Sequence, residues 1–454
     1  MTPLGAVLTS VLVVIVFALP RRFALLGIMA GVCYLTQMQQ LNLGGFNFTG
    51  IRFILLAGLL RVFARGEYKD LKINRIDSVV LSYPIAVTVA YTVRLGTTEA
   101  LVYQLGCSYD ILLSYFVFRS TFNNLDTVQQ FIGDLALLIV PLAVLMVYES
   151  VTRNNAFGFA VDERYIREGR LRCTGSFRGP ITAGIFGATL IPFFVGLFLE
   201  HYRRGVMIAG LLAALAITFT SNSSGPLMAL LSGIVGFVFW SIRLNMRTVR
   251  WGIVAALVCL HVVMKPPVWF LLAKMSNLTG GDGWHRSYVM DQGIRHFWDW
   301  CLLGTSDTAE WAATVMSTGQ ADITNQYLAS GVAGGAIAVI LFILIIVRCF
   351  QGLGRTLEAV RKNFATMEKF FWCCGCALFA HVVTIFSVSY FDQMHVAWWA
   401  FIALISASTA GIASDQADPG QLKGADGFPE GVNGQCHQLG RIELVGDRTA
   451  KTLW

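Results

Sequence analysis

Residues 180–199 read PITAGIFGATLIPFFVGLFL and contain no charged side chain. About 20 apolar residues in a helix span the hydrocarbon core of a bilayer. Backbone N–H and C=O groups find no water in lipid, so a single spanning segment must satisfy its hydrogen bonds internally, as a helix does. This stretch therefore predicts a transmembrane helix.

Similar apolar stretches occur on both sides of it along the chain. Of the 454 residues, 55% are hydrophobic and only 13% are charged, whereas a soluble domain carries about 25% charged residues. The predicted fold class is all-α, a polytopic membrane helix bundle. We expect about 13 spans, near residues 4–19, 23–37, 49–65, 77–94, 98–118, 130–149, 180–199, 205–220, 226–241, 250–267, 327–348, 368–388 and 393–413.

Lysine and arginine are distributed by membrane side. Cytoplasmic loops are enriched in these residues, so the connections that hold them are assigned to the cytoplasm, with the N-terminus outside and the C-terminus inside. The net charge of +7 is explained by this distribution, and no nucleic-acid partner is expected. The assigned residues are Arg21, Arg22, Arg61, Arg65, Lys69, Lys72, Arg75, Arg119, Arg203, Arg204, Arg243, Arg247, Arg250, Arg355, Arg361, Lys362 and Lys369.

Two outer loops and a tail complete the predicted organisation. Residues 1–413 are expected to form the transmembrane domain, with the larger extracytoplasmic loops at 150–179 and 267–326. Residues 414–454 are rich in Gly, Asp and Gln, a composition typical of a disordered segment, here cytoplasmic.

The first outer loop carries arginine and no lysine. Guanidinium groups bind phosphate oxygens through two parallel hydrogen bonds and stay charged at physiological pH. Arg172 and Arg178 flank a turn at Gly175 next to the following span, and they are candidate ligands for a phosphate or pyrophosphate group. Arg164 and Arg167 lie among acidic residues, and we interpret them as part of a solvated, ion-paired surface rather than as ligands.

The second outer loop contains GWHRSYVMDQGIRHFWDW at residues 283–300. Apolar residues recur there at helical spacing, which predicts an amphipathic helix on the outer membrane surface. Asp291 and Arg295 are placed for an ion pair one turn apart. His285 is a candidate acid–base catalyst, because imidazole titrates near neutral pH, or simply a surface residue, and Arg286 is a candidate substrate ligand.

Three further positions are candidates. Asp322 and Asn325 precede the span at 327–348; Asp322 could accept a proton from a hydroxyl, Asn325 could bind substrate, and a helix N-cap explains one of them. Asp110 lies inside an expected span, where a carboxylate is costly and therefore a functional candidate. Ser223, in a turn before the span at 226–241, could help to bind an anion at that helix start.

No metal or nucleotide motif is present. The sequence lacks a P-loop, a His-Glu-x-x-His, an Asp-x-Asp and a nucleotide-binding glycine fingerprint, so no cofactor is expected. Cys373, Cys374 and Cys376 are read as small residues in helix packing. Cys173 and Cys301 both fall in outer loops and either form a disulfide or stay free.

Several motifs occur in a fixed order. Arg172, Gly175, Phe177 and Pro180 follow the pattern Arg-x-x-Gly-x-Phe-x-x-Pro before a span. Ser-Ser-Gly at 223–225 precedes another span, and Asp-Ile-Thr-Asn-Gln-Tyr-Leu at 322–328 leads into a glycine-rich helix start after the large late loop. Together these features resemble the O-antigen ligase and O-antigen polymerase superfamily of bacterial envelope enzymes over roughly residues 50–410.

The resemblance implies a function. Members of this superfamily transfer glycan from an undecaprenyl-pyrophosphate carrier to a hydroxyl of a glycan or lipid acceptor, on the outer face of the bacterial inner membrane, without metal or nucleotide. Arg172 matches a family pyrophosphate ligand. Many members carry histidine where this chain has Thr324, and arginine where it has Ser224. The base is therefore left open between His285 and Asp322, and the activity between polymerase and ligase.

Two other classes of function are compatible with the sequence. Asp110 and the glycine-interrupted spans would suit a transporter or permease for a glycan or another anionic solute. A non-catalytic envelope-assembly protein would also fit a family member that has lost its base.

Overall fold

The computed structural model describes residues 1–43, 46–159, 165–167, 169–274, 282–312, 319–363 and 367–417. The chain divides into two compact units, Met1–Ala413 and Ser414–Trp454. The first unit is described below.

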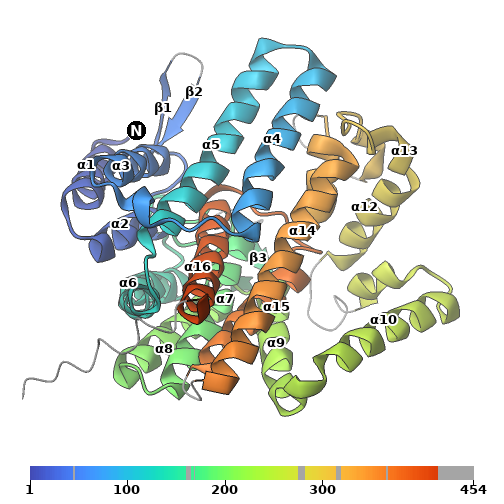
Figure 1. The fold of residues 1–454 in the computed structure, drawn as a ribbon. Helices are drawn as coiled ribbons and strands as arrows, with labels where there is room; N and C mark the ends of the chain where they lie inside the picture. The colour runs from blue at the N-terminus through green and yellow to red at the C-terminus, as the bar shows by residue number, and fades with distance from the viewer. Residues whose placement is uncertain are drawn as a thin grey trace, which may run out of the picture. The chain divides into compact units, whose positions relative to one another are not determined.

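The described part of this unit is overwhelmingly helical (Figure 1). Every apolar segment expected from the sequence coincides with a helix. The long helices are α1 (Pro3–Ala18), α2 (Arg21–Tyr34), α3 (Gly50–Ala64), α4 (Arg75–Leu95), α5 (Thr98–Thr121), α6 (Leu125–Thr152), α7 (Pro180–Leu199), α8 (Arg204–Thr220), α9 (Ser224–Val238), α10 (Met246–Val263), α14 (Gln326–Asn363), α15 (Glu368–Thr384) and α16 (Asp392–Ala417).

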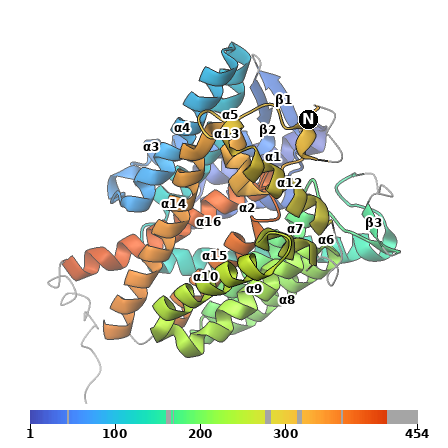
Figure 2. The same ribbon diagram turned by 90° about the vertical axis from the view of Figure 1, so that its right-hand side faces the viewer.

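Shorter elements fill the connections. Two antiparallel hairpins pair β1 (Gln40–Leu43) with β2 (Phe46–Thr49) and β3 (Ile166–Arg167) with β4 (Arg170–Leu171). The β3–β4 hairpin projects beyond α6 and α7 (Figure 2). The short helices are α12 (Gly283–Arg295), α13 (Phe297–Trp300) and the 3-10 turns η1 (Glu67–Asp70), η3 (Phe239–Asn245), η4 (Val268–Phe270) and η5 (Ala309–Trp311).

Six helical segments of the described chain are long and apolar enough to cross a bilayer, which makes the chain a multi-pass membrane protein. The fifth runs through α9, η3 and α10. Two shorter apolar helices, α1 and α8, accompany them. The count of about 13 spans stays a prediction. The six segments are Arg75–Leu95, Thr98–Thr121, Leu125–Thr152, Pro180–Leu199, Ser224–Val263 and Gln326–Lys362.

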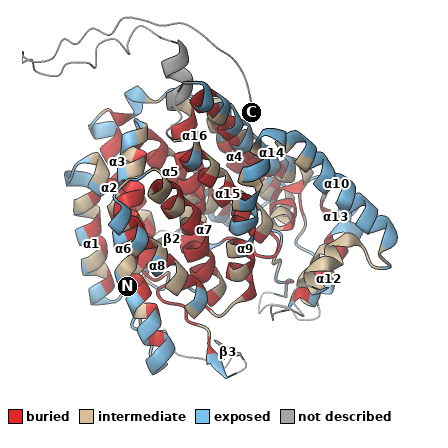
Figure 3. Cartoon of the chain, turned by 90° about the horizontal axis from the view of Figure 1, so that it is seen from below, coloured by how far each residue is buried: buried red, intermediate tan, exposed pale blue. Residues whose placement is uncertain are grey.

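Burial agrees with a lipid environment. α7 is mostly buried at the centre of the bundle, whereas α10 has no buried residue (Figure 3). Large apolar side chains such as Val89, Val144 and Leu212 are exposed on the outer helices. A soluble monomer rarely exposes so much contiguous apolar surface, and acyl chains would cover it in a bilayer.

Ion pairs join helix ends at one end of the bundle. The carboxylate of Asp134 on α6 is only 6% exposed and binds the guanidinium groups of both Arg22 on α2 and Arg203 at the start of α8. Arg119 on α5 pairs with Asp77 on α4. All three arginines belong to the set that the sequence assigns to the cytoplasm.

α14 is broken near its start, where it meets the late outer loop. Gly335 has φ 73° and ψ −172°, which interrupts the helical hydrogen bonds. The N–H of Ala336 donates instead to the carbonyl of Cys301 at 2.8 Å, and the carbonyl of Val332 accepts from the N–H of Thr305. Arg94, the one basic residue of a short outer connection, also donates to Val332. The break therefore anchors the late loop.

Candidate functional site

A buried carboxylate shapes the turn at Gly175. Glu149, at the end of α6, is 3% exposed and accepts hydrogen bonds from the backbone N–H groups of Thr174 at 3.0 Å and Gly175 at 2.9 Å. Gly175 has φ 57°, a conformation that glycine adopts without steric cost. The side chain of Asn155 donates to the carbonyl of Gly175. These contacts make the turn a fixed part of the bundle.

Three other elements hold the same segment. The N–H of Cys173 donates to the carbonyl of Thr220 at the end of α8. The hydroxyl of Ser176 donates to the carbonyl of Cys33 on α2, and Gln393 on α16 donates to the carbonyl of Ser176 at 2.8 Å. Arg172 thus extends from a loop whose backbone is tied to four helices.

Arg172 reaches the turn before α9. Its Nη2 and Nε donate to Oγ of Ser223 at 2.9 and 3.2 Å, and that hydroxyl donates to the carbonyl of Ser221. Burial away from water, followed by the positive charges of Arg167 and Arg286, lowers the pKa of Arg172 to about 10. The guanidinium still carries its charge at neutral pH.

Arg286 brings the second outer loop to the same place. It lies in the first turn of α12 and is partly buried. Burial lowers the pKa of Arg286, the carboxylates of Asp282 and Asp322 oppose this effect, and the charge of Arg167 adds to it. The charges of Arg167 and Arg286 thus act on Arg172, and those of Asp282, Asp322 and Arg167 act on Arg286, so electrostatic effects link these five groups of the two loops. We call them the arginine cluster.

The arginine cluster has a positive balance. Among the described residues it comprises three guanidinium groups and two carboxylates, which leaves one positive charge. Within the described residues, the guanidinium of the half-buried Arg172 donates hydrogen bonds only to the neutral hydroxyl of Ser223. An anion with several oxygens would compensate this charge and would accept hydrogen bonds from more than one guanidinium.

α12 is fixed by its own cap and by contacts to neighbouring segments. The side chain of Asp282 accepts from the N–H of His285 at 3.1 Å, as an N-cap does. The predicted ion pair of Asp291 and Arg295 is present at 2.7 Å. Trp269 also donates to Asp291. His285 is half-buried and precedes Arg286 in the first turn of α12.

Asn325 and Asp322 occupy different environments. Asn325 is 3% exposed, its Oδ1 accepts from the N–H of Leu328, and its Nδ2 donates to the carbonyl of Phe386. It is the N-cap of α14, which accounts for the side chain without a substrate. Asp322 is exposed and acts electrostatically on Arg286. Asp322 thus offers an exposed carboxylate, whereas the amide of Asn325 is already used as a helix cap.

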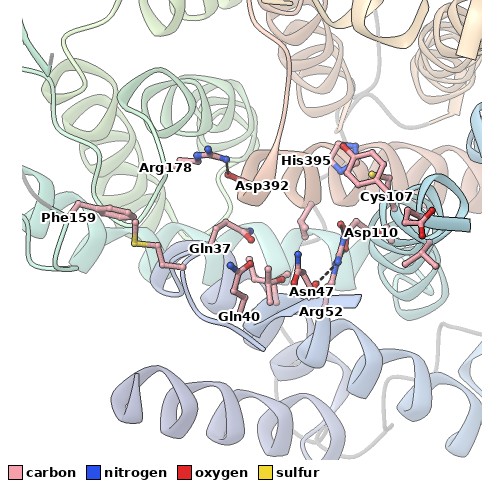
Figure 4. A pocket seen from close by; sticks show the side chains of 18 of the residues that line it. Gln37, Gln40, Asn47, Arg52, Cys107, Asp110, Phe159, Arg178, Asp392 and His395 are labelled. Carbon is pink, nitrogen blue, oxygen red and sulfur yellow. Dashed lines mark hydrogen bonds and ion pairs between the residues drawn. The ribbon is translucent and has the colours of Figure 1, made fainter. Parts of the chain in front are cut away.

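Arg178 and Asp110 lie apart from these contacts. Both line a cavity of about 840 Å³ that Arg172 and Arg286 do not line (Figure 4). Arg178 is exposed and pairs with Asp392 at 3.8 Å. Arg178 therefore contacts Asp392, whereas Arg172 contacts Ser223, so the two arginines have different partners.

Several residues at this end were not identified from the sequence. Glu149, Arg52 and Asp392 each make the contact that positions a predicted residue. Glu149 ends an apolar span, where a carboxylate is costly, and that position was a usable signal. The partnership of Arg52 with Asp110 joins residues 58 positions apart and has no local signature.

The nine cysteines among the described residues are free thiols. Cys173 is buried and Cys301 is half-buried, and neither forms a disulfide. Burial, together with the charge of Glu149, raises the pKa of Cys173 to about 12. Within the described residues no group of three or more His, Cys, Asp or Glu side chains is arranged to hold a metal ion.

Comparison of the sequence with protein-family models and with curated proteins finds no match.

Proposed function

We propose that this chain is a membrane glycosyltransferase of the O-antigen ligase or polymerase type. It would transfer or polymerise glycan from an undecaprenyl-pyrophosphate carrier on the outer face of a bacterial inner membrane. The observation that supports this most is the arginine cluster, in which guanidinium groups from two distant loops are electrostatic neighbours. The proposal includes about 13 spans, an outer N-terminus and a cytoplasmic C-terminus.

The chemistry requires charge stabilisation more than a cofactor. A bond forms between the acceptor oxygen and the anomeric carbon of the donor glycan, and the bond from that carbon to the pyrophosphate oxygen breaks. Arg172 and Arg286 would neutralise the departing pyrophosphate, an electrostatic role that a preorganised site performs well. The acceptor proton passes to the base, for which Asp322 and His285 both adjoin Arg286.

The turn at Gly175 would hold Arg172 in position before the substrate binds. Glu149 fixes the backbone through two charge-assisted hydrogen bonds, and Ser223 fixes the guanidinium. A group that is held before the substrate arrives loses little freedom on binding. The position of Arg172 is thus preorganised for a pyrophosphate beside the membrane.

A transporter remains the second candidate, because the Arg52–Asp110 ion pair faces a large cavity. Reconstitution separates the two. Purified protein in proteoliposomes is given a polyprenyl-pyrophosphate-linked oligosaccharide, and products are analysed by mass spectrometry. We expect glycan longer than the supplied unit, or glycan joined to an added acceptor.

The matched variants are Arg172→Ala and Arg170→Ala. Arg170 is exposed and lies in β4, two residues before Arg172. The first should abolish product and the second should leave it unchanged, at equal protein levels. Full product formation by Arg172→Ala would refute the proposed site. Movement of intact lipid-linked oligosaccharide across the bilayer, without new glycan, would favour the transporter.

A further inference from the structure

The cavity lined by Arg178 and Asp110 has a different chemical character from the arginine cluster. It has a volume of about 840 Å³, within the range of roughly 300–1,000 Å³ typical of ligand pockets. Its walls come from the 37–52 segment, α5, the first outer loop and the start of α16 (Figure 4). It lies at the end of the bundle that carries the outer loops.

Its charge balance does not favour a phosphate. Two guanidinium groups, Arg52 and Arg178, line it together with three carboxylates, Glu99, Asp110 and Asp392. One negative charge therefore remains, the opposite of the balance in the arginine cluster. A polyanion would be repelled, whereas a neutral ligand rich in hydroxyl groups could donate to these carboxylates.

One wall is held rigidly. Arg52 donates to both carboxylate oxygens of Asp110, at 2.8 and 2.6 Å, and also to the carbonyls of Asn47 and Gly106. This bidentate arrangement fixes both side chains between α3, α5 and the end of the β1–β2 hairpin. The amides of Gln37, Gln40 and Asn47 line the same region and offer both donors and acceptors.

Asp392 forms the opposite wall and has an unsatisfied oxygen. Its Oδ2 is buried and accepts no hydrogen bond from the described residues, with Nη1 of Arg178 at 3.8 Å. Its φ is 51°, in the left-handed region that non-glycine residues seldom adopt. Such backbone conformations cluster at ligand-binding sites. A hydroxyl donor in the cavity would satisfy this oxygen.

Aromatic side chains complete the lining. Tyr103 on α5 and Phe159 in the first outer loop both face the cavity, and Tyr103 is largely exposed. Aromatic rings offer flat apolar faces with a polar edge. The apolar C–H face of a pyranose can pack on such a ring while its hydroxyl groups bind carboxylates and amides.

From this lining we infer that the cavity is a carbohydrate-binding subsite that takes the glycan portion of the substrate. The inference rests on the proposed function and adds the place of the sugars to it. The segment from Arg172 to Arg178 joins the two sites, so one loop would contact pyrophosphate at one end and sugar at the other. Arg178 then holds Asp392 in place rather than binding phosphate.

The test compares two probes on purified protein in nanodiscs. The first is oligosaccharide released by mild acid from the polyprenyl-pyrophosphate-linked pool of the native cells. The second is farnesyl pyrophosphate, which carries no sugar. Asp392→Asn keeps the shape and tolerates the left-handed backbone, and Tyr103→Ala removes the ring. Tyr148→Ala, an exposed tyrosine on α6 outside the cavity, is the matched control.

We expect Asp392→Asn and Tyr103→Ala each to weaken oligosaccharide binding about tenfold, the effect of losing one hydrogen bond to a charged group or one packed ring. Farnesyl pyrophosphate binding should not change in either variant, and Tyr148→Ala should change neither probe.

Two outcomes would overturn the inference. Wild-type protein could bind farnesyl pyrophosphate and not the oligosaccharide, or both cavity variants could bind the oligosaccharide as wild type does. In either case the transferase proposal would stand. Conversely, oligosaccharide binding that depends on Tyr103, combined with normal transfer by Arg172→Ala, would remove the proposed pyrophosphate site and leave the sugar subsite.

Discussion

Arg172 carries its charge in a partly buried place. Burying a charge costs free energy, so the arrangement calls for a physical reason. The guanidinium binds the hydroxyl of Ser223 and has two arginines as electrostatic neighbours. Folding alone gains nothing from bringing like charges together. The arrangement makes physical sense when an anion joins it, which is the reason for placing the pyrophosphate here.

The pKa of Arg172 gives a pH prediction. Because burial and the neighbouring arginines lower it to about 10, the charged form is disfavoured in the folded protein, but it still dominates below pH 9. Farnesyl pyrophosphate affinity should therefore stay constant from pH 7 to pH 9 and fall above pH 10, as Arg172 loses its proton. Titration calorimetry on folded protein checks this, and a fall in affinity between pH 7 and 8 would contradict it.

Glu149 supports the site without touching substrate. Replacing it by glutamine leaves one acceptor oxygen and turns an amide N–H₂ towards a backbone N–H of Thr174 or Gly175. We expect a local loss of about 1–3 kcal/mol, seen as faster hydrogen exchange at these two amides and weaker farnesyl pyrophosphate binding. Glu310→Gln, at an exposed position, is the control. Unchanged exchange at Gly175 would show that the turn does not depend on Glu149.

For single residues, the sequence indicated candidate side chains better than it indicated the residues that these side chains contact. Arg172, Ser223, Arg286 and Asp322 were candidates from local chemistry, and the structure gathers them at one place. Asn325 is occupied as a helix cap. Arg178 resembled Arg172 in every local respect, and only the direction of the chain after Gly175 separates the two, which spacing does not encode.

At the scale of elements the glycine break in α14 holds the late loop. The break leaves backbone groups of α14 without helical hydrogen-bond partners. Residues 301–305, which follow α13, bind these groups instead. A continuous helix would leave the late loop without this anchor. The sequence predicted a helix start rich in glycine, and the break itself became visible only from the backbone angles at Gly334 and Gly335.

Gly335→Ala tests this anchor. An added Cβ would lie 2.3 Å from the carbonyl oxygen of Leu302, at a positive φ. We expect a loss of about 1–3 kcal/mol from backbone strain alone, a lower Tm in detergent, and loss of glycan transfer. Gly354→Ala on the same helix has open space around it and should behave as wild type. Normal transfer by Gly335→Ala would show that the loop needs no such anchor.

Helix positions were predictable because each span must be apolar over its own length, which is a local property. Bounds differ mainly where capping residues decide them, as at Asn74, which forms a capping box with Asp77. Packing between helices was not predictable. α10, read as an ordinary span, has no buried residue.

Over the whole molecule, ion pairs gather at the end opposite the arginine cluster. Asp134 connects α2, α6 and α8 there. Asp134→Asn would leave two guanidinium groups without their carboxylate, at a cost of about 3–5 kcal/mol. Thermal unfolding in detergent should show a clearly lower Tm, whereas Asp126→Asn, exposed on the same helix, should not. Equal Tm values for both variants would mean that this cluster adds no stability.

The central claim is that two loops far apart in the sequence form one pyrophosphate site. Farnesyl pyrophosphate binding to wild type, Arg172→Ala, Arg286→Ala and the double variant tests it most directly, with Arg170→Ala as control. We predict that each single change weakens binding at least about tenfold. The double variant should lose less than the sum, because both side chains hold the same group. Wild-type affinity in either single variant would contradict the claim.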